Sequence, residues 1–338
     1  MLVGLTGATG YIGRFVVQEL HERGVAVRAL GRAGSERTGF AGPIQWCSGS
    51  LESDDVVLAR FVAGTDAIVH CALEHVPGRY RGGEGTDLSR FIAVNVGGSL
   101  RLMQAARRSG VRRFIVLSSR AAYGDGGRGS GSDGDGDGRG GDSAGRLLHE
   151  DSALQPDTHY GACKAAIDAF VSSWGRAGDW DICALRPTGV YGVVHPLKRT
   201  KWLELIDAVR RGKTWPESRC ATEVHGKDVA RAVWFLLGAP DIAGRAFNCS
   251  DLLVSTRDVA RIVQRLTGAV GPLPPEPSGP TPRIMTCDAL QSRGFTFGGK
   301  PLLQATVAEI VTLLEQQRST AGAGVGWSGA ACASQELR

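Results

Sequence analysis

Tyr160 and Lys164 are the two residues whose types and spacing most clearly suggest chemistry. They stand four positions apart in a segment, residues 160–175, with apolar residues at helical spacing, so both side chains share one helix face. A nearby ammonium favours the phenolate and lowers the pKa of a tyrosine, which is ordinarily about 10. Such a phenol can donate and accept a proton. Ser119, at the end of an apolar run, adds a hydroxyl that can hold a reacting oxygen.

Glycines at positions 7, 10 and 13 form a second chemical feature, the pattern G-x-x-G-x-x-G. In such a turn Gly7 permits a tight bend, Gly10 lets the backbone approach a pyrophosphate, and Gly13 lets a helix pack close to a strand. The backbone N–H groups at the helix N-terminus attract the anion. The spacing differs from the G-x-G-x-x-G of other dinucleotide folds. An apolar run before it and an amphipathic stretch after it nevertheless predict a dinucleotide-binding turn.

The end of the second apolar run indicates which dinucleotide is bound. An NAD enzyme usually has an acidic residue there for the ribose 2′-hydroxyl, but this chain has Gly31 followed by Arg32. A guanidinium suits a 2′-phosphate, so NADP is favoured, with NAD as the alternative if Arg32 only faces solvent. We expect the residues after the third and fourth runs to lie beside the adenine and its ribose: Ser50, Leu51, Cys71 and Ala72.

The elements that must position these residues alternate along the chain. Short β-branched runs predict strands at residues 2–6, 25–30, 44–47, 67–71, 114–118 and 182–186, and helical spacing predicts helices at 11–23, 53–62, 91–109 and 160–175. This order predicts an α/β fold, a Rossmann-type doubly wound parallel sheet. Further along the chain, helices are expected at 201–211, 227–237, 256–266 and 303–317, and a strand at 246–249.

We therefore predict an NAD(P)-binding domain at 1–185 and a smaller C-terminal substrate-binding region at 186–318, with some of its segments returning to the first domain. Eleven glycines within residues 124–145 indicate a mobile loop. Three aspartates in that loop imitate the start of a calcium-binding EF-hand, but the position of the last ligand is Ala144, so we expect no calcium. Residues 319–338 are small and polar, which predicts a frayed tail.

Composition and charge exclude several classes of binding partner. The net charge is only +5 over 338 residues, with no basic cluster interleaved with aromatic residues, so we expect no nucleic-acid partner. The longest apolar run has six residues, at 232–237, which predicts no membrane span, and no signal peptide is recognised, so we expect a cytoplasmic protein. Neither histidines nor cysteines have metal-ligand spacing, and no metal is expected. The partner that we expect is therefore a small-molecule substrate, and a homodimer is compatible with the sequence.

Seven motifs occur in a characteristic order: TGATGYIG at 6–13, DAIVHCA at 66–72, NVGGS at 95–99, LSSRAAYG at 117–124, YGACK at 160–164, RPTGVYG at 186–192 and EVHGKDVARA at 223–232. In this series the chain resembles the extended short-chain dehydrogenase/reductase family, which includes sugar-nucleotide epimerases and dehydratases. The resemblance implies that Tyr160 is the acid/base, that Ser119 is the catalytic serine, and that Lys164 binds the nicotinamide ribose. It also implies a set of cofactor-binding residues: Gly7, Thr9, Gly10, Tyr11, Ile12, Gly13, Arg32, Ser50, Leu51, Cys71, Ala72, Asn95, Lys164 and Pro187.

Departures from the family pattern concern the substrate. Dehydratases have Asp-Glu after the catalytic residue, where this chain has Arg120 and Ala121, so dehydration is not expected. Gly189 and Ala221 stand where many sugar-nucleotide enzymes have an asparagine and an arginine for the diphosphate. We therefore predict an NAD(P)-dependent oxidoreductase. The alternatives are a sugar or sugar-nucleotide epimerase and, in another class, a catalytically silent NADP-binding regulator. His195 follows RPTGVYG and is a further candidate for the substrate pocket.

Overall fold

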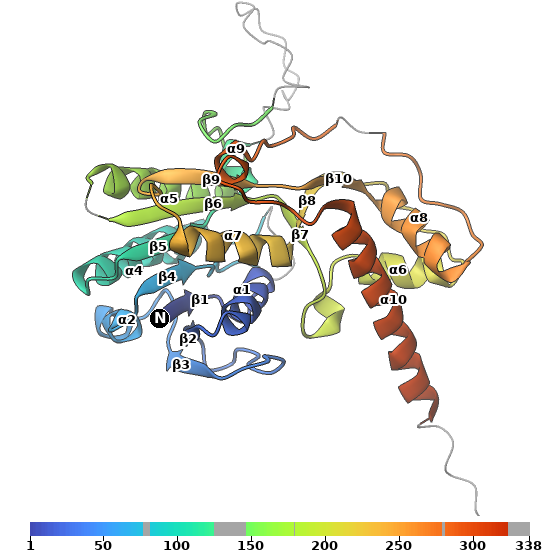
Figure 1. The fold of residues 1–338 in the computed structure, drawn as a ribbon, viewed down its shortest axis with the longest axis horizontal. Helices are drawn as coiled ribbons and strands as arrows, with labels where there is room; N and C mark the ends of the chain where they lie inside the picture. The colour runs from blue at the N-terminus through green and yellow to red at the C-terminus, as the bar shows by residue number, and fades with distance from the viewer. Residues whose placement is uncertain (77–81, 125–146, 179, 279–280, 324–338) are drawn as a thin grey trace, which may run out of the picture.

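The main sheet has seven strands, all parallel, in the order β3-β2-β1-β4-β5-β6-β9 (Figure 1). The computed structural model describes residues 1–76, 82–124, 147–178, 180–278 and 281–323, with side chains as far as residue 317. The strands are β1 (Leu2–Thr6), β2 (Ala26–Gly31), β3 (Ile44–Ser48), β4 (Ala67–His70), β5 (Arg113–Leu117), β6 (Asp181–Pro187) and β9 (Arg245–Cys249). The predicted Rossmann-type sheet is confirmed, with strand ends within two residues of the expected ones.

Helices cover both faces of this sheet. On one face, α1 (Tyr11–Glu22) and α7 (Gly226–Gly238) share a buried apolar cluster with strand residues such as Val3 and Leu5. A second cluster on the other face joins the sheet to α2 (Asp55–Val62), α4 (Gly98–Arg108) and α5 (His159–Arg176). Every residue of β4 is buried, as expected for a central parallel strand covered on both sides.

The predicted helix at 91–109 is interrupted in the structure. It consists of α3 (Leu88–Ile92), a π-helical turn (Ala93–Gly97) and then α4. Single π-helical turns within helices are rare and often occur at functional sites. This turn contains Asn95, one of the expected cofactor-binding residues.

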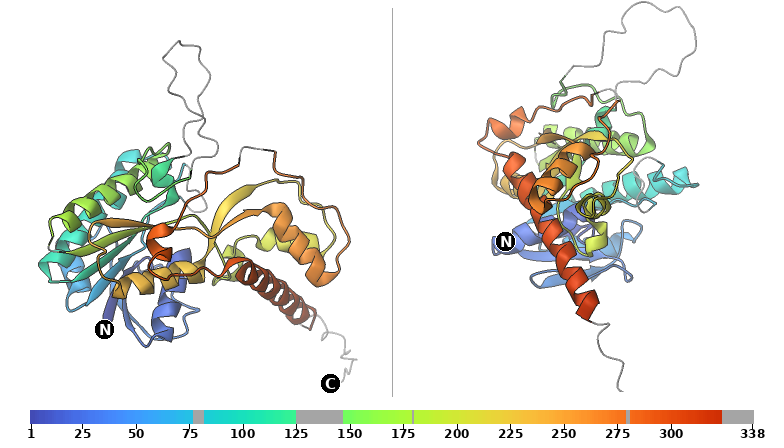
Figure 2. Two further views of the ribbon diagram at one scale, coloured as in Figure 1. Left: turned by 45° about the horizontal axis from the view of Figure 1, so that its top comes forward. Right: turned by 90° about the vertical axis from the view of Figure 1, so that its right-hand side faces the viewer.

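A second layer stands beside the carboxyl edge of the main sheet (Figure 2). Its sheet has the order β10-β8-β7, from β7 (Gly189–Tyr191), β8 (Cys220–His225) and β10 (Leu252–Ser255), none of which was among the expected strands. Three helices pack in this layer around one apolar cluster: α6 (Leu203–Arg210), α8 (Thr256–Thr267) and α10 (Gly299–Ala323). Helix α8 begins at a capping box between Ser255 and Asp258. The remaining helical segments are 3-10 turns at Arg120–Tyr123 (η2) and Leu197–Arg199 (η3) and a short α9 (Asp288–Gln291).

The expected C-terminal boundary needs one correction. Helix α10 continues through Ala323, beyond the predicted start of the tail at residue 319, because residues 319–321 contain no helix breaker and helix extension is cooperative; the next glycines along the chain stand at 322 and 324. Residues 324–338 and nearly all of the glycine-rich segment 124–145 lie outside the described residues. Within the described part of the chain, no helix combines the length and the apolarity that crossing a bilayer requires.

Candidate active site

The glycine-rich turn connects β1 to α1 in a conformation that requires glycine. Gly7 has φ +73°, and a Cβ there would lie 2.7 Å from the backbone nitrogen of Ala72. A Cβ on Gly13 would lie 2.0 Å from the carbonyl oxygen of Gly7, so the helix can start this close to the strand only without a side chain. The Gly10 N–H donates to the Gly7 carbonyl at 2.9 Å and closes the turn. The sequence expectation for this turn thus agrees with its geometry.

The N-terminus of α1 offers its N–H groups to an anion. Gly10 is the N-cap, no side chain caps the helix, and its first turn has no acidic residue. Uncapped N–H groups at a helix N-terminus attract phosphate. The tight glycine turn and this uncapped helix terminus therefore fit a dinucleotide pyrophosphate.

All the expected cofactor-binding and catalytic residues lie at or just after the carboxyl ends of parallel strands, or on the helices that pack there. Their positions are as follows: Thr9, Gly10, Tyr11, Ile12 and Gly13 after β1; Arg32 after β2; Ser50 and Leu51 after β3; Cys71 and Ala72 after β4; Asn95 in the π-helical turn; Ser119 after β5; Tyr160 and Lys164 in α5; and Pro187 at the end of β6. Ligands of doubly wound sheets bind at this edge.

A buried hydrogen-bond chain that the sequence analysis missed supports the turn. His70 contacts the hydroxyl of Thr6 through Nδ1 at 2.6 Å and that of Ser99 through Nε2 at 2.8 Å. The Thr6 hydroxyl also accepts the Ala72 N–H at 3.2 Å. Burial lowers the pKa of His70 to about 3, so its imidazole is neutral at physiological pH. The available signal was that Thr6 and His70 each stand at the end of an apolar run, but the pairing of β1 with β4 that brings them together was not evident from the sequence.

Asn95 positions the segment after β4 by using both ends of its side-chain amide. Oδ1 accepts the backbone N–H of Glu74 at 2.8 Å, while Nδ2 donates to the carbonyl oxygens of Glu74 at 2.8 Å and Phe91 at 3.0 Å. Next to this segment, burial raises the pKa of the Cys71 thiol to about 12. Cys71 is therefore an uncharged wall residue, and a nucleophilic role for it is not supported.

Two arginines surround the end of β2, where the ribose 2′ group of a dinucleotide would lie. The Arg32 side chain is 69% exposed, and its Nη1 is 3.7 Å from a carboxylate oxygen of Glu74. Glu74 makes a shorter contact of 2.6 Å with Arg90. Arg37 donates to the carbonyl of Arg32 at 3.2 Å, and its guanidinium carbon lies 4.7 Å from the centre of the Trp46 ring.

Tyr160 and Lys164 project from the N-terminal half of α5. The Lys164 ammonium is buried, donates to the Leu117 carbonyl at 2.6 Å and lies 5.9 Å from the centre of the Tyr160 ring. Burial lowers the pKa of Lys164, while the carboxylate of Asp168, one turn further along, acts in the opposite direction. One ammonium hydrogen is thus used within the protein, and two remain for other acceptors.

Ser119 lies on the element that adjoins Tyr160. It is the N-cap of η2, and its hydroxyl accepts the Ala121 N–H at 3.1 Å. Helix α5 approaches η2 so closely that a Cβ on Gly161 would lie 2.3 Å from the Ala121 carbonyl oxygen. Gly161 therefore allows the close packing that puts Tyr160 and Ser119 on adjoining elements.

A buried ion pair fixes α5 against the sheet. Arg186 donates from Nε to Asp168 at 2.7 Å and from Nη1 to the Tyr123 hydroxyl at 2.6 Å. Burial raises the pKa of Asp168, and the guanidinium of Arg186 opposes that rise. The Tyr123 hydroxyl donates in turn to Asn248 on β9 at 2.8 Å. This network joins α5, η2, β6 and β9.

In the second layer, a second buried carboxylate occupies the space beside Gly189. A Cβ on Gly189 would lie 2.6 Å from an Oε atom of Glu223, whose side chain is only 4% exposed. The Lys201 ammonium donates to both Glu223 oxygens, at 2.5 and 2.6 Å. Glu223 was not singled out in the sequence, because its approach to Gly189 depends on the pairing of β7 with β8.

Residues 192–201 lie against the start of α1 and connect the two layers. Arg199 donates to the Thr9 carbonyl at 2.9 Å, the Tyr11 hydroxyl donates to the Gly192 carbonyl at 2.7 Å, and the Lys201 N–H donates to that hydroxyl at 3.2 Å. His195 belongs to this segment, but its Nε2 contacts the Thr38 hydroxyl at 3.1 Å. The structure thus places His195 beside the loop after β2.

Comparison with known proteins gives a consistent picture. A sequence model described as "NAD dependent epimerase/dehydratase family" matches residues 3–250. A 3 beta-hydroxysteroid dehydrogenase/Delta 5-->4-isomerase of Mycobacterium tuberculosis is 29% identical over 211 residues, which is 62% of this chain and 51% of the relative. A UDP-glucose 4-epimerase of Vibrio cholerae is 24% identical over 215 residues, covering 63% of this chain and 58% of the relative. The chain thus spans about half the length of these curated relatives.

Solved structures match over nearly the whole chain. MoeE5 in complex with UDP-glucose and NAD has a TM-score of 0.69 at 27% identity, covering 95% of this chain and all of that one. A UDP-glucose 4-epimerase of Thermotoga maritima, solved with UDP-glucose, has a TM-score of 0.72 at 19% identity, with coverage of 94% and 100%. At that identity the second likeness concerns the fold alone.

Proposed function

Because this chain belongs to the NAD-dependent epimerase/dehydratase family, we propose that it is an NAD(P)-dependent oxidoreductase of the extended short-chain dehydrogenase/reductase type. Its reaction interconverts a carbinol and a carbonyl carbon of a small molecule. One observation carries the proposal: a buried lysine lies next to Tyr160 at the same sheet edge as a dinucleotide-fitting turn. A catalytically silent regulator would not require that arrangement.

The residues of this chain would divide the work as follows. The turn at Gly7–Gly13 and the N-terminus of α1 hold the pyrophosphate, and Lys164 offers its remaining ammonium hydrogens to the nicotinamide ribose. When bound, the nicotinamide supplies or accepts the hydride. The Tyr160 hydroxyl gives a proton to the carbonyl oxygen in reduction and takes it back in oxidation. The Ser119 hydroxyl holds that oxygen in place.

We assign NADP as the favoured cofactor. Gly31 ends β2 without an acidic side chain, and Arg32 and Arg37 provide two guanidinium groups around that strand end. A guanidinium binds phosphate through paired charge-assisted hydrogen bonds. Arg199, which belongs to the second layer, donates one N–H to the Thr9 carbonyl and so adds a third guanidinium, beside the glycine-rich turn. Its other N–H groups can then bind the phosphates of the cofactor.

Tyr160→Phe tests the catalytic assignment. We expect turnover of a carbonyl substrate with NADPH, followed by the absorbance of reduced nicotinamide, to fall by about a hundredfold or more, because proton transfer is lost while the ring still packs. The NADPH dissociation constant should change little. Tyr191→Phe is the matched control, since the buried Tyr191 hydroxyl has no hydrogen-bond partner among the described residues. Retention of full activity by Tyr160→Phe would contradict the assignment.

A sugar or sugar-nucleotide epimerase is the second candidate function, because relatives such as the Vibrio cholerae UDP-glucose 4-epimerase are named for that activity. An epimerase oxidises and re-reduces one carbon, so it retains its nucleotide through purification and shows no net change in nicotinamide absorbance. An oxidoreductase consumes added NAD(P)H in proportion to product. Nucleotide content and stoichiometry, measured on the same preparation, therefore separate the two.

A further inference from the structure

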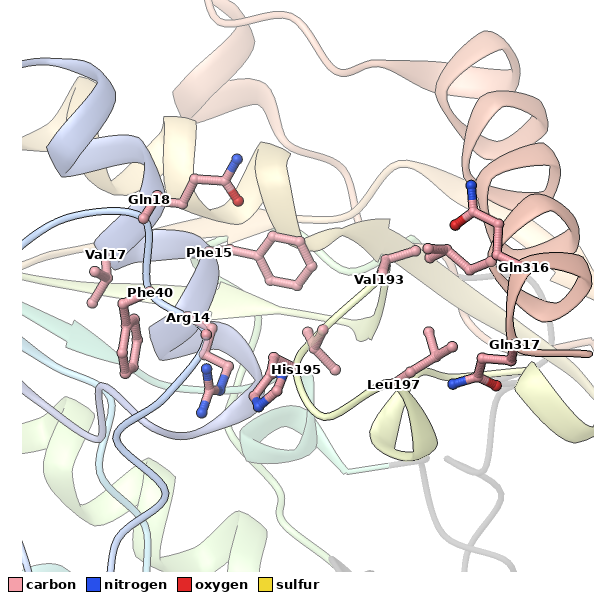
Figure 3. Close-up of a pocket in the computed structure, with 14 residues that line it drawn as sticks. Arg14, Phe15, Val17, Gln18, Phe40, Val193, His195, Leu197, Gln316 and Gln317 are labelled. Carbon is pink, nitrogen blue, oxygen red and sulfur yellow. The ribbon is translucent and has the colours of Figure 1, made fainter. Parts of the chain in front are cut away.

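A cavity of about 600 Å³ lies between α1 and the C-terminal half of α10 (Figure 3). Helix α1 and residues 39–41 form one wall, and residues 193–197 and the C-terminal half of α10 form the other. Its volume is within the usual range for small-molecule sites, about 300–1,000 Å³. None of the residues that line it belongs to the proposed catalytic or cofactor-binding set.

Arg14 brings a buried cation to this cavity. The residue is only 7% exposed, and its Nη atoms donate to the carbonyls of Thr38 at 2.8 Å and Glu36 at 3.0 Å. Its guanidinium carbon lies 4.6 Å from the centre of the Phe40 ring. Nε is buried and, among the described residues, has no hydrogen-bond partner. Each Nη atom carries a second hydrogen beyond the one that it donates to a carbonyl, so the guanidinium keeps donors for an acceptor in the cavity.

The charge around Arg14 is incompletely neutralised. Burial and the nearby Arg199 guanidinium both lower the pKa of Arg14, against a smaller opposing effect of the Glu36 carboxylate. That carboxylate accepts hydrogen bonds from the backbone N–H and the hydroxyl of Thr38, at 3.1 and 2.5 Å. Because the Thr38 hydroxyl hydrogen is used on Glu36, the His195 Nε2 at 3.1 Å acts as donor to Thr38. The site therefore favours an anion.

The rest of the wall is mainly apolar. Phe15 and Val193 face the middle of the cavity, while Arg14, Phe40 and His195 lie at one end of it, as Figure 3 shows. Leu197 and, on α10, Leu313, Gln316 and Gln317 line the opposite end, which therefore also carries two side-chain amides. A ligand that fills this space needs one anionic end and an apolar body.

We propose that this cavity is a second ligand site, separate from the proposed catalytic one, which binds an amphiphilic monocarboxylate. The carboxylate lies against the Arg14 guanidinium and accepts from its Nη groups, and the apolar chain lies between Phe15, Val193 and Leu313. A bulky phosphate suits the site less well, because the walls beyond Arg14 are mainly apolar. A ligand here contacts α1 and α10 at once and so stabilises the two layers against each other.

Calorimetry with the full chain and decanoate tests the proposal. We expect one site per chain, with 1-decanol bound at least tenfold more weakly because it lacks the charge-assisted contact. Arg14→Gln should weaken decanoate by tenfold or more, whereas Arg23→Gln, on the exposed end of the same helix, should not. Equal binding of 1-decanol and decanoate would refute the carboxylate contact with Arg14.

A second variant keeps the test independent of how well Arg14→Gln folds. Leu313→Trp places a larger side chain in the cavity without touching Arg14 and should abolish decanoate binding. Leu253→Trp is its control, because Leu253 is 42% exposed on β10 and does not line the cavity. Thermal unfolding checks that each variant is folded. The proposal is overturned by absence of decanoate binding below its micelle concentration, or by binding that Leu313→Trp leaves unchanged.

Discussion

Individual residues of the site differ in how far the sequence reveals them. Tyr160, Lys164 and the three glycines are recognisable because their chemistry depends on spacing within one turn or one helix. The contact between Thr6 and His70 joins residues 64 positions apart, and that between His70 and Ser99 spans 29. Such contacts depend on which strands are neighbours and on their register, which local patterns do not contain.

Arg32→Ala should weaken NADPH much more than NADH. A charge-assisted contact to phosphate contributes about 1.5–3 kcal/mol, or roughly tenfold to a hundredfold in the dissociation constant. The measurement is a fluorescence titration of both reduced nucleotides. Arg112→Ala, which removes an exposed arginine before β5, is the control and should leave both constants unchanged. Tighter binding of NADH than of NADPH by the unmodified protein would reverse the cofactor assignment.

His70 should make the protein less stable in acid. Its folded pKa of about 3 is below the ordinary value of 6.5, so as pH falls the unfolded chain takes up the proton first. The contribution of neutral His70 to the free energy of unfolding is therefore complete above pH 6.5 and is lost as pH falls towards about 3. Between pH 7 and pH 5 the loss in unfolding free energy is about 2 kcal/mol.

His70→Gln should reduce that pH-dependent loss by about the same amount, measured by urea unfolding at the two pH values. His225, with a pKa lowered by burial to about 4, adds a similar loss in both proteins and leaves the difference unchanged. His149→Gln, at an imidazole that is 48% exposed, is the control. An identical pH dependence for His70→Gln and the unmodified protein would show that His70 is not the titrating group.

At the scale of elements, the strands of the main sheet are predictable and those of the second sheet are not. The former are mostly apolar, with polar residues chiefly at their ends, whereas β7 has three residues and β8 contains threonine, glutamate and histidine. Short strands with polar residues have no clear period, and their pairing depends on tertiary contacts. The π-helical turn at Ala93–Gly97 was missed for a related reason, since its sequence fits an ordinary helix equally well.

The ion pair between Arg186 and Asp168 should be the main polar attachment of α5. Arg186→Met leaves a buried carboxylate without its partner, so we expect a loss of about 3–5 kcal/mol in unfolding free energy. The double variant Arg186→Met/Asp168→Leu should lose less than Arg186→Met alone, because no charge remains buried. Arg211→Met, at a half-exposed pair on α6, should change stability by under about 1 kcal/mol. A double variant less stable than Arg186→Met would argue against this account.

At the scale of the whole molecule, we propose that the second layer limits which substrates reach the sheet edge. We propose that UDP, dTDP and GDP bind poorly, because Gly189 and Ala221 offer no polar side chain and the Lys201 ammonium is already paired with Glu223, so a diphosphate would lose hydration for little return. Calorimetry in the presence of NADP tests this, with binding of NADP itself as the positive control. Micromolar affinity for any one of the three would restore the sugar-nucleotide epimerase as the leading candidate.

The strand β9 has a consequence for how the chain folds during its synthesis. The first six strands of the main sheet are complete at Pro187, but β9 and α7 follow only after residues that build the second layer. Until α7 has left the ribosome, apolar residues of α1 such as Val16 and Leu20 lack the cover that Val229 and Val233 provide. A nascent chain of about 190 residues therefore exposes an apolar helix face, the kind of surface that chaperones bind. The Rossmann part of this protein can reach its final packing only after β7, α6 and β8 of the second layer have been synthesised.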